Sequence, residues 1–80
     1  MKYNGNFILF CQKLGSKIKS IREQQKISIK EMAVMTDIRI EYLIKIEQGT
    51  AYGVLLDKHL SKIAKALHLK LYELFDFEKY

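Results

Sequence analysis

Few side chains in this 80-residue sequence have the types and spacing that catalysis or metal binding requires. His59 and His68 have no Cys or His companion at the spacing of a metal site. Asp76 and Glu78 fall in a short terminal segment, without a base or a nucleophile beside them. No glycine-rich phosphate loop and no nucleophile–base pair is recognisable. We therefore expect no enzyme activity, no metal site, no cofactor and no small-molecule ligand.

The composition favours binding to a polyanion. The chain has 14 Lys and Arg against nine Asp and Glu, a formal net charge of +5. A small basic domain of this kind suits nucleic acid or an acidic membrane surface. The apolar patch at residues 7–11 is too short to span a membrane and lacks the order of parts of a signal peptide. For this reason we expect no membrane partner. Because the single Cys11 cannot form an internal disulfide, we expect a cytoplasmic protein.

Helical periodicity runs through most of the chain and indicates one small domain. The boundaries that we expect are a flexible N-terminal segment at 1–6, the domain at 7–76 and a short tail at 77–80. Within the domain, helices are expected at about 7–25, 29–35, 39–48, 55–67 and 71–75. One side of the first helix carries Lys13, Lys17, Lys19 and Arg22. Gly15 is a weak helix former and could divide this helix in two.

The clearest local signal is the start of the second helix. Ser28 and Glu31 have the S-x-x-E spacing of a capping box, in which each side chain bonds the backbone amide of the other residue. Ile27 and Met32 stand where a hydrophobic staple forms. Residues 36–38 then predict a turn, because Thr and Asp side chains bond nearby backbone.

The later segments show which residues should form the core. In the third helix Leu43 and Ile46 are expected inside, and Gly49 is placed to end the helix in a left-handed conformation. The fourth helix should bury Leu56, Leu60, Ile63, Ala64 and Leu67 and expose Lys58, Lys62 and Lys65. The last turn should bring Leu71, Leu74 and Phe75 to an apolar cluster.

Two short helices separated by a three-residue turn make a helix-turn-helix, here at about 29–48. Four segments resemble the Cro/λ-repressor-like (XRE) family of DNA-binding domains in order and approximate spacing: LGSKIKSIREQQKIS from residue 14, EMAVMTDI from residue 31, EYLIKIEQG from residue 41 and LSKIAKALHLKLYELF from residue 60. The resemblance covers roughly residues 14–75. It implies an all-α, compact five-helix λ-repressor-like domain.

The resemblance also implies which residues would contact double-stranded DNA. In the family the third helix lies in the major groove and reads base edges, while the second helix crosses the backbone. The base-reading positions would be Arg39, Ile40, Glu41, Tyr42, Ile44 and Lys45. The phosphate-binding positions would be Ser28, Ile29, Lys30, Lys17, Thr50 and Tyr52.

Several positions depart from the family pattern. Ile29 replaces a common Gln, and Arg39 is a poor N-cap, so Thr36 or Asp37 could cap the third helix instead. Glu41 would repel phosphates unless it accepts from cytosine. Exposed and adjacent, Ile29, Ile40 and Ile44 would form an apolar patch better suited to a protein.

Two functions follow from these observations. The first is a sequence-specific transcriptional regulator that acts as a homodimer by occupying a palindromic operator. Its dimer contacts could use Leu71, Phe75 and Phe77 or the segment 7–10, although either set could equally be core. The alternative is the same fold used as a protein-interaction module, with a cytoskeletal or antitoxin-type partner.

Overall fold

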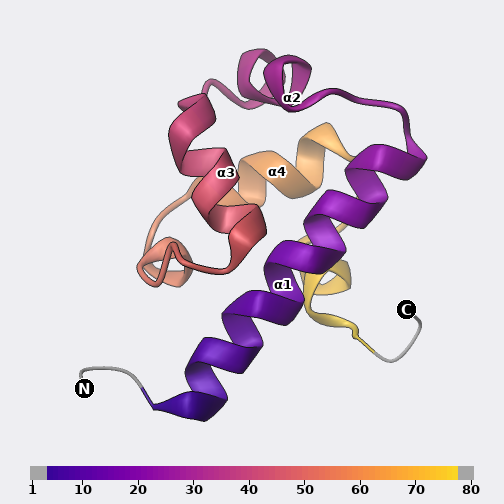
Figure 1. Ribbon diagram of the computed structural model, residues 1–80. Helices are drawn as coiled ribbons and strands as arrows, with labels where there is room; N and C mark the ends of the chain where they lie inside the picture. The colour runs from indigo at the N-terminus through magenta and orange to yellow at the C-terminus, as the bar shows by residue number, and fades with distance from the viewer. Residues whose placement is uncertain (1–3, 78–80) are drawn as a thin grey trace.

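The computed structural model describes residues 4–77, and the expectations for residues 1–3 and 78–80 lie outside this range. Its elements in chain order are α1 (Gly5–Gln24), α2 (Ile29–Thr36), α3 (Ile40–Gln48), the 3₁₀ turn η1 (Val54–Leu56), α4 (His59–Ala66) and the 3₁₀ turn η2 (Leu71–Phe75). Figure 1 shows this order along the chain. The expected all-α fold is confirmed.

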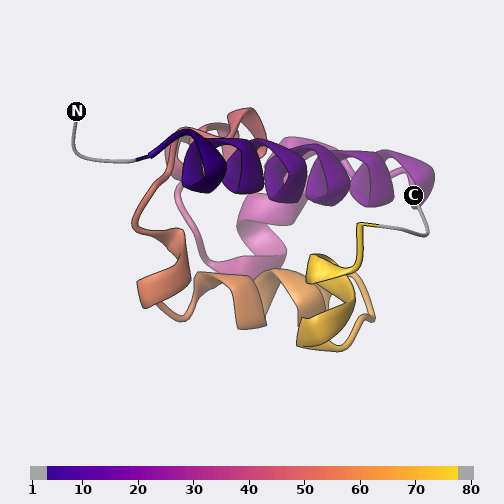
Figure 2. The same cartoon turned by 90° about the horizontal axis from the view of Figure 1, so that it is seen from below.

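Two layers enclose the core. In Figure 2, α1 runs along one side of the molecule, and α4 lies with η1 and η2 along the opposite side. α1 packs against α3 and η2, and α2 packs against both α3 and α4. The largest side chains that become fully buried between these elements are Leu14, Ile18, Met32, Leu43, Ile63, Leu67 and Leu74.

The first helix begins earlier than the apolar pattern predicts. Asn4 is its N-cap, with its Oδ1 accepting from the Phe7 amide at 2.8 Å, so Gly5 and Asn6 are helical rather than part of a loose segment. Gly15 does not divide the helix. A Cβ at this position would lie 2.6 Å from the Glu47 carbonyl oxygen and closer still to that of Ile46. Gly15 therefore allows the backbones of α1 and α3 to approach closely.

The helix-turn-helix keeps the predicted capping box but begins α3 differently. The Glu31 amide donates to Ser28 Oγ at 3.0 Å, and the Ser28 amide donates to the Glu31 carboxylate at 2.8 Å. Thr36 belongs to α2 rather than to the turn, because its buried hydroxyl donates to the Met32 carbonyl at 2.7 Å. Arg39 is the N-cap of α3 and makes no side-chain capping bond, so the expected cap by Thr36 or Asp37 is wrong.

Gly49 ends α3 as expected, with φ of 80° in the left-handed region. The expected single helix at 55–67 is wrong, because η1 precedes a shorter α4. The break follows from Asp57, whose Oδ1 accepts from the His59 amide at 2.9 Å and so satisfies one amide of the first turn. The predicted inward face of α4 is otherwise correct at Leu60, Ile63, Ala64 and Leu67, whereas the side chain of Leu56 is not described.

The two apolar ends of the chain meet in one aromatic cluster. Phe10 of α1 stacks on Phe75 with ring centroids 5.9 Å apart and meets Phe77 edge-on at 5.6 Å. Phe77 thus packs on the domain rather than lying in a tail. Leu71, expected in this cluster, is 43% exposed and lies outside the core. Residues of the two segments that were expected as alternative dimer contacts, at 7–10 and 71–77, therefore pack against each other within one chain.

Candidate nucleic-acid interface

One strip of α3 faces solvent. Glu41, Ile44, Lys45 and Gln48 are all exposed, and the 3.6-residue period of the helix places them on one side. Leu43 and Ile46, on the other side, are buried as the sequence predicts. The sequence reasoning missed Gln48, although its position four residues after Ile44 could have revealed it.

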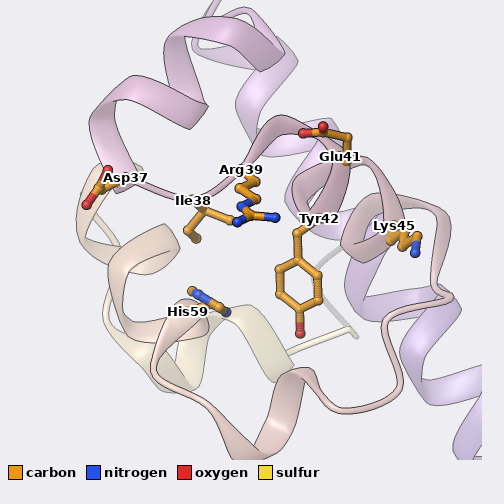
Figure 3. Close-up of a pocket in the computed structure, with 7 residues that line it drawn as sticks. All are labelled: Asp37, Ile38, Arg39, Glu41, Tyr42, Lys45 and His59. Carbon is orange, nitrogen blue, oxygen red and sulfur yellow. The ribbon is translucent and has the colours of Figure 1, made fainter.

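A hollow of about 490 Å³ lies at the N-terminal end of this strip. Figure 3 shows the side chains that line it: Asp37, Ile38, Arg39, Glu41, Tyr42, Lys45 and His59. Arg39 and Lys45 bring positive charge to the hollow, and Asp37 and Glu41 bring negative charge. Within residues 4–77, no hydrogen bond or ion pair engages the Arg39, Glu41 or Lys45 side chain. These three groups are therefore open to a ligand.

Tyr42, expected among the base-reading residues, is engaged inside the protein. Its hydroxyl donates to Asp57 Oδ2 at 2.9 Å, and its ring centroid lies 5.0 Å from that of His59. Figure 3 shows the two rings side by side in the hollow. The buried His59 Nδ1 lies 3.0 Å from the same Asp57 oxygen, in contact but without hydrogen-bond geometry. Tyr42 thus ties α3 to the start of α4.

The electrostatics of this contact keep Tyr42 as a neutral donor. Burial, and then the hydrogen bond to Asp57, raise the pKa of Tyr42 to about 12. Burial opposes ionisation of Asp57, but the bonds from the His59 amide and the Tyr42 hydroxyl outweigh it and lower the pKa of that carboxyl. At neutral pH a phenol therefore donates to a carboxylate, which makes the bond charge-assisted. We call Tyr42, Asp57 and His59 the α3–α4 clip.

The isoleucines of the expected apolar patch are only partly brought together. Ile44 is 41% exposed, whereas Ile29 and Ile40 are half-buried. Ile29 and Ile44 line a second hollow of about 210 Å³, together with Lys19, Arg22, Glu47 and Gln48. Ile40 does not line it. The apolar surface beside α3 is thus small.

The start of α2 carries its own carboxylate. Ser28, expected to bind phosphate, donates its amide to Glu31 and accepts with its hydroxyl. The hydrogen bonds from the Ser28 backbone and side chain lower the pKa of Glu31. The amides of Ile29 and Lys30 remain in the first turn, where helices leave such groups unbonded. Anion binding here would therefore depend on the backbone amides of Ile29 and Lys30 and on the exposed Lys30 side chain. The anion would lie beside the negative charge of Glu31.

Lys17, expected to bind phosphate, is engaged inside the protein. Its side chain is only 6% exposed, and its Nζ donates to the Asp76 carbonyl oxygen. Burial between α1 and the C-terminal segment fixes it as a structural residue. Thr50 is exposed, with its Oγ1 3.3 Å from the Lys45 carbonyl oxygen. Tyr52 is half-buried, with its ring centroid 6.3 Å from that of Phe7.

Arg22 is likewise structural. Its Nε lies 2.7 Å from Glu47 Oε2, its Nη2 3.0 Å from Oε1, and its Nη1 2.7 Å from the Ile27 carbonyl oxygen. The hydrogen bond to Glu47 raises the pKa of Arg22 against the effect of burial. The basic side predicted for the first helix is therefore divided. Lys13 and Lys19 face solvent, whereas Lys17 and Arg22 hold the domain together.

α2 and α3 are arranged as the two helices of a helix-turn-helix. In a comparison with known families, residues 15–79 match the family model described as a helix-turn-helix domain. The chain belongs to this helix-turn-helix family. The family falls in the Cro/λ-repressor-like (XRE) group, as the sequence resemblance predicts. No curated protein and no solved structure matches the chain.

Membership in the helix-turn-helix family indicates a DNA-binding regulator in general. α2 and α3 are the two helices of the motif. In the described part of this helix-turn-helix domain, no helix is long and apolar enough to cross a membrane. Nor do residues 4–77 contain a group of three or more His, Cys, Asp or Glu side chains that could hold a metal ion.

Proposed function

We propose that the protein is a sequence-specific regulator that binds double-stranded DNA in the cytoplasm and acts by occupying its operator. The observation that carries this proposal is the strip of α3 residues, Glu41, Ile44, Lys45 and Gln48, which continues into Arg39 at the helix start. The polar members of this strip have no partner within residues 4–77. A helix with such a strip can enter the major groove, which is wide enough to admit it.

Each side chain of the strip has a chemical role in this proposal. Arg39 can donate two hydrogen bonds to guanine, and Gln48 can bond adenine in the same bidentate manner. Glu41 can accept from the amino group of cytosine, while Ile44 can pack on a thymine methyl group. Lys45 can donate to guanine or to a phosphate. The half-buried Ile40 has a lesser part, and Tyr42 acts indirectly by positioning α3.

Phosphate contacts would come from elements at the two ends of the motif. The amides of Ile29 and Lys30 point from a helix N-terminus, where anions bind favourably. The Lys30 side chain adds charge, and at the other end of α3 the exposed Thr50 hydroxyl could donate to a phosphate in exchange for its long bond to the Lys45 carbonyl. Tyr52 is the weakest candidate, since its ring packs on Phe7.

A single recognition helix reads few base pairs. We propose a homodimer on a palindromic operator, because two copies placed roughly 34 Å apart would read successive turns of one DNA face. Such an arrangement multiplies the discrimination of one domain without requiring any further domain.

Selection from a random pool of duplex DNA, followed by titration against scrambled DNA at several salt concentrations, tests this proposal. We expect a palindromic winner that binds at least ~10³-fold tighter than scrambled DNA, the low end of specific recognition. Weak binding that is equal for all sequences and vanishes with salt would refute it, because counterion release alone gives that result.

A pair of double variants locates the binding surface. Replacing Arg39 and Lys45 with Ala should weaken operator binding by about 100-fold, because a good base contact contributes ~1–3 kcal/mol. The matched control, Lys62→Ala with Lys65→Ala, removes the same charge from α4. It should change binding by less than ~5-fold, since only the general attraction to phosphates is reduced. Equal losses would exclude α3 as the reading element.

The alternative function, a protein-interaction module, has its own observations. The Ile29–Ile44 hollow offers apolar surface, and the Glu31 carboxylate stands where a DNA phosphate would approach α2. In that case the partner would be of cytoskeletal or antitoxin type. Failure of the DNA selection, with the fold intact, would favour this function.

A further inference from the structure

A groove of about 500 Å³ runs between the end of α2 and the side of α4. Its lining residues are Met35, Thr36, Asp37, Lys62, Lys65, Ala66 and His68, none of which belongs to α3. In Figure 2, α4 lies on the side of the molecule opposite α1. This groove, the α2–α4 groove, shares only Asp37 with the hollow at the start of α3.

The lining of the α2–α4 groove combines two lysines with apolar surface, and the exposed carboxylate of Asp37 stands at the end that it shares with the hollow at the start of α3. Lys62 and Lys65 stand one helical turn apart and are both exposed, and His68 follows just beyond the end of α4. Residues 58–72 contain four Lys and two His but no Asp or Glu, although the whole chain has nine acidic residues. Met35, 51% exposed, and Ala66 supply the apolar part of the lining.

Local stability does not account for this combination. Lys65 in the last turn of α4 favours the helix dipole, a contribution of about 0.3–1 kcal/mol. Lys62 lies further from the helix end, where this effect is small. Within the described residues, neither lysine makes an ion pair or a side-chain hydrogen bond. Met35 contributes little to the core when half of its surface is exposed.

We propose that the α2–α4 groove binds an acidic peptide segment of a partner protein, with apolar side chains interleaved among the carboxylates. The carboxylates would pair with Lys62 and Lys65 and could accept a hydrogen bond from the His68 ring, and an apolar side chain would cover Met35 and Ala66. A DNA backbone has charge for the lysines but no apolar group for Met35. The charge and the apolar lining together therefore select a peptide.

The probe is a fluorescein-labelled synthetic peptide of 14 residues with Leu at helical i, i+3, i+4 and i+7 spacing and Glu elsewhere. As a helix it would be about 21 Å long. The control peptide has the same composition in an order that destroys the apolar stripe. Fluorescence anisotropy with the full chain, at roughly 0.05 and 0.15 M salt, measures both affinities. We expect the striped peptide to bind at least ~5-fold tighter than the control.

Charge-reversal variants assign the site. Lys62→Glu with Lys65→Glu should weaken binding of the striped peptide by at least ~10-fold. Lys13→Glu with Lys19→Glu, an equal change in net charge on α1, should weaken it by less than ~3-fold because only the general field changes. Equal weakening by the two pairs, or equal affinity for both peptides, would overturn the proposal.

The apolar lining has a matched pair on one helix. Met35→Ser should weaken peptide binding by about 3-fold, because one partly exposed side chain loses its contact. Val34→Ser should have no effect, since Val34 is 83% exposed and lies outside the groove lining. Competition with duplex DNA separates this proposal from the DNA-binding function. Displacement of the peptide by DNA from the wild type would overturn a separate peptide site, whatever the outcome of the operator selection.

Discussion

The two sides of α3 are held to the rest of the domain by different chemistry. Toward α1, the backbones touch at Gly15, and a buried ion pair joins Arg22 to Glu47 at 2.7 Å. Toward α4, the contact is the α3–α4 clip beside an open hollow of about 490 Å³. One side is close-packed, and the other is bridged by polar groups.

The α1 side leaves little freedom of register. Gly49, just after α3, also packs tightly, since a Cβ there would lie 2.7 Å from the Gln12 Cα. Two backbone approaches and a bidentate ion pair fix both the distance between the helices and their relative rotation. Packed backbones resist small displacements more strongly than partly exposed hydrogen bonds do.

The α4 side is softer because its groups are partly exposed. The side chains of His59 and Asp57 are 33% and 32% exposed, against 9% and 7% for Arg22 and Glu47. Water can replace the clip bonds, so each contributes less net stability than a buried contact. We infer that α1 sets where α3 lies and that the clip adjusts the end of α3 that would meet bases.

Breaking the backbone contact on the α1 side should have the largest effect. Gly15→Ala gains about 0.5–1 kcal/mol of helix propensity. It also places a Cβ against two carbonyl oxygens, so the helices must separate. We expect a net loss of at least about 3 kcal/mol in the free energy of unfolding, measured by urea denaturation.

Gly5→Ala is the matched control for this change, because a Cβ at Gly5 meets nothing within 4 Å. Its stability should stay within about 0.5 kcal/mol of the wild type. If Gly15→Ala were as stable as Gly5→Ala, the backbones of α1 and α3 would not be in the described contact.

Breaking the ion pair should have the next largest effect. Glu47→Ala leaves the Arg22 guanidinium buried with only the Ile27 carbonyl as a bonding partner. We expect a loss of about 2–3 kcal/mol, near the lower end for buried pairs, because Arg22 keeps that bond. Thermal unfolding monitored by circular dichroism measures it.

Glu41→Ala on the same helix removes an exposed carboxylate without a partner in the described residues. It should cost no more than about 1 kcal/mol, the effect of a charge on the helix dipole. Equal destabilisation by Glu47→Ala and Glu41→Ala would show that the ion pair contributes nothing beyond local helix stability.

These contacts also show which features the sequence could predict. Ser28, Glu31 and Gly49 act within a few residues of themselves, so their spacing alone predicts the capping box and the end of α3. Gly15 is an unfavourable residue for a helix when only its neighbours in sequence are considered. Its role is a close contact with residues about thirty positions away, which local spacing does not reveal. Lys17 and Arg22 have the same local pattern as the exposed Lys13 and Lys19. Only the tertiary structure separates the two pairs.

The candidate interface was predictable to a similar extent. Periodicity identifies α3 as the exposed helix with Leu43 and Ile46 inside. It does not reveal that the Tyr42 hydroxyl has a partner fifteen residues away. Nor does the apolar pattern of residues 55–67 reveal the break before α4, where the Asp57 side chain accepts from the His59 amide at the start of that helix.

On the softer side, Asp57→Ala should have a moderate effect. It removes the acceptor of both the His59 amide and the Tyr42 hydroxyl. A lost hydrogen bond costs about 0.5–1.5 kcal/mol, and because two donors lose their acceptor we expect about 1.5 kcal/mol here. Asp57→Asn keeps an acceptor for the His59 amide and should recover more than half of that loss in the same denaturation assay. No difference between the two variants would mean that these hydrogen bonds contribute nothing.

Tyr42→Phe should have the smallest effect of the four. It removes one partly exposed hydrogen bond, for which we expect a loss of about 0.5–1 kcal/mol. Tyr72→Phe is the control, because Tyr72 is 66% exposed and should show no change. If the clip positions α3, Tyr42→Phe should also weaken operator binding while the preferred sequence stays the same. A changed base preference would instead make Tyr42 a direct reader.

The pH dependence of the Tyr42→Phe difference tests the clip itself. The pKa of Tyr42 is raised from 10.0 to about 12, so its contribution is complete below pH 10 and is lost as pH rises through about 12. The pKa of Asp57 is lowered from 3.8, so its contribution is present above that value and is lost as pH falls through the lower folded pKa. The stability difference between wild type and Tyr42→Phe should therefore be widest between about pH 5 and 9 and shrink as the pH falls below 3.8 and Asp57 becomes protonated. A difference that stays constant from neutral to acid pH would mean that Tyr42 stabilises α3 by packing on His59 and not through the Asp57 carboxylate.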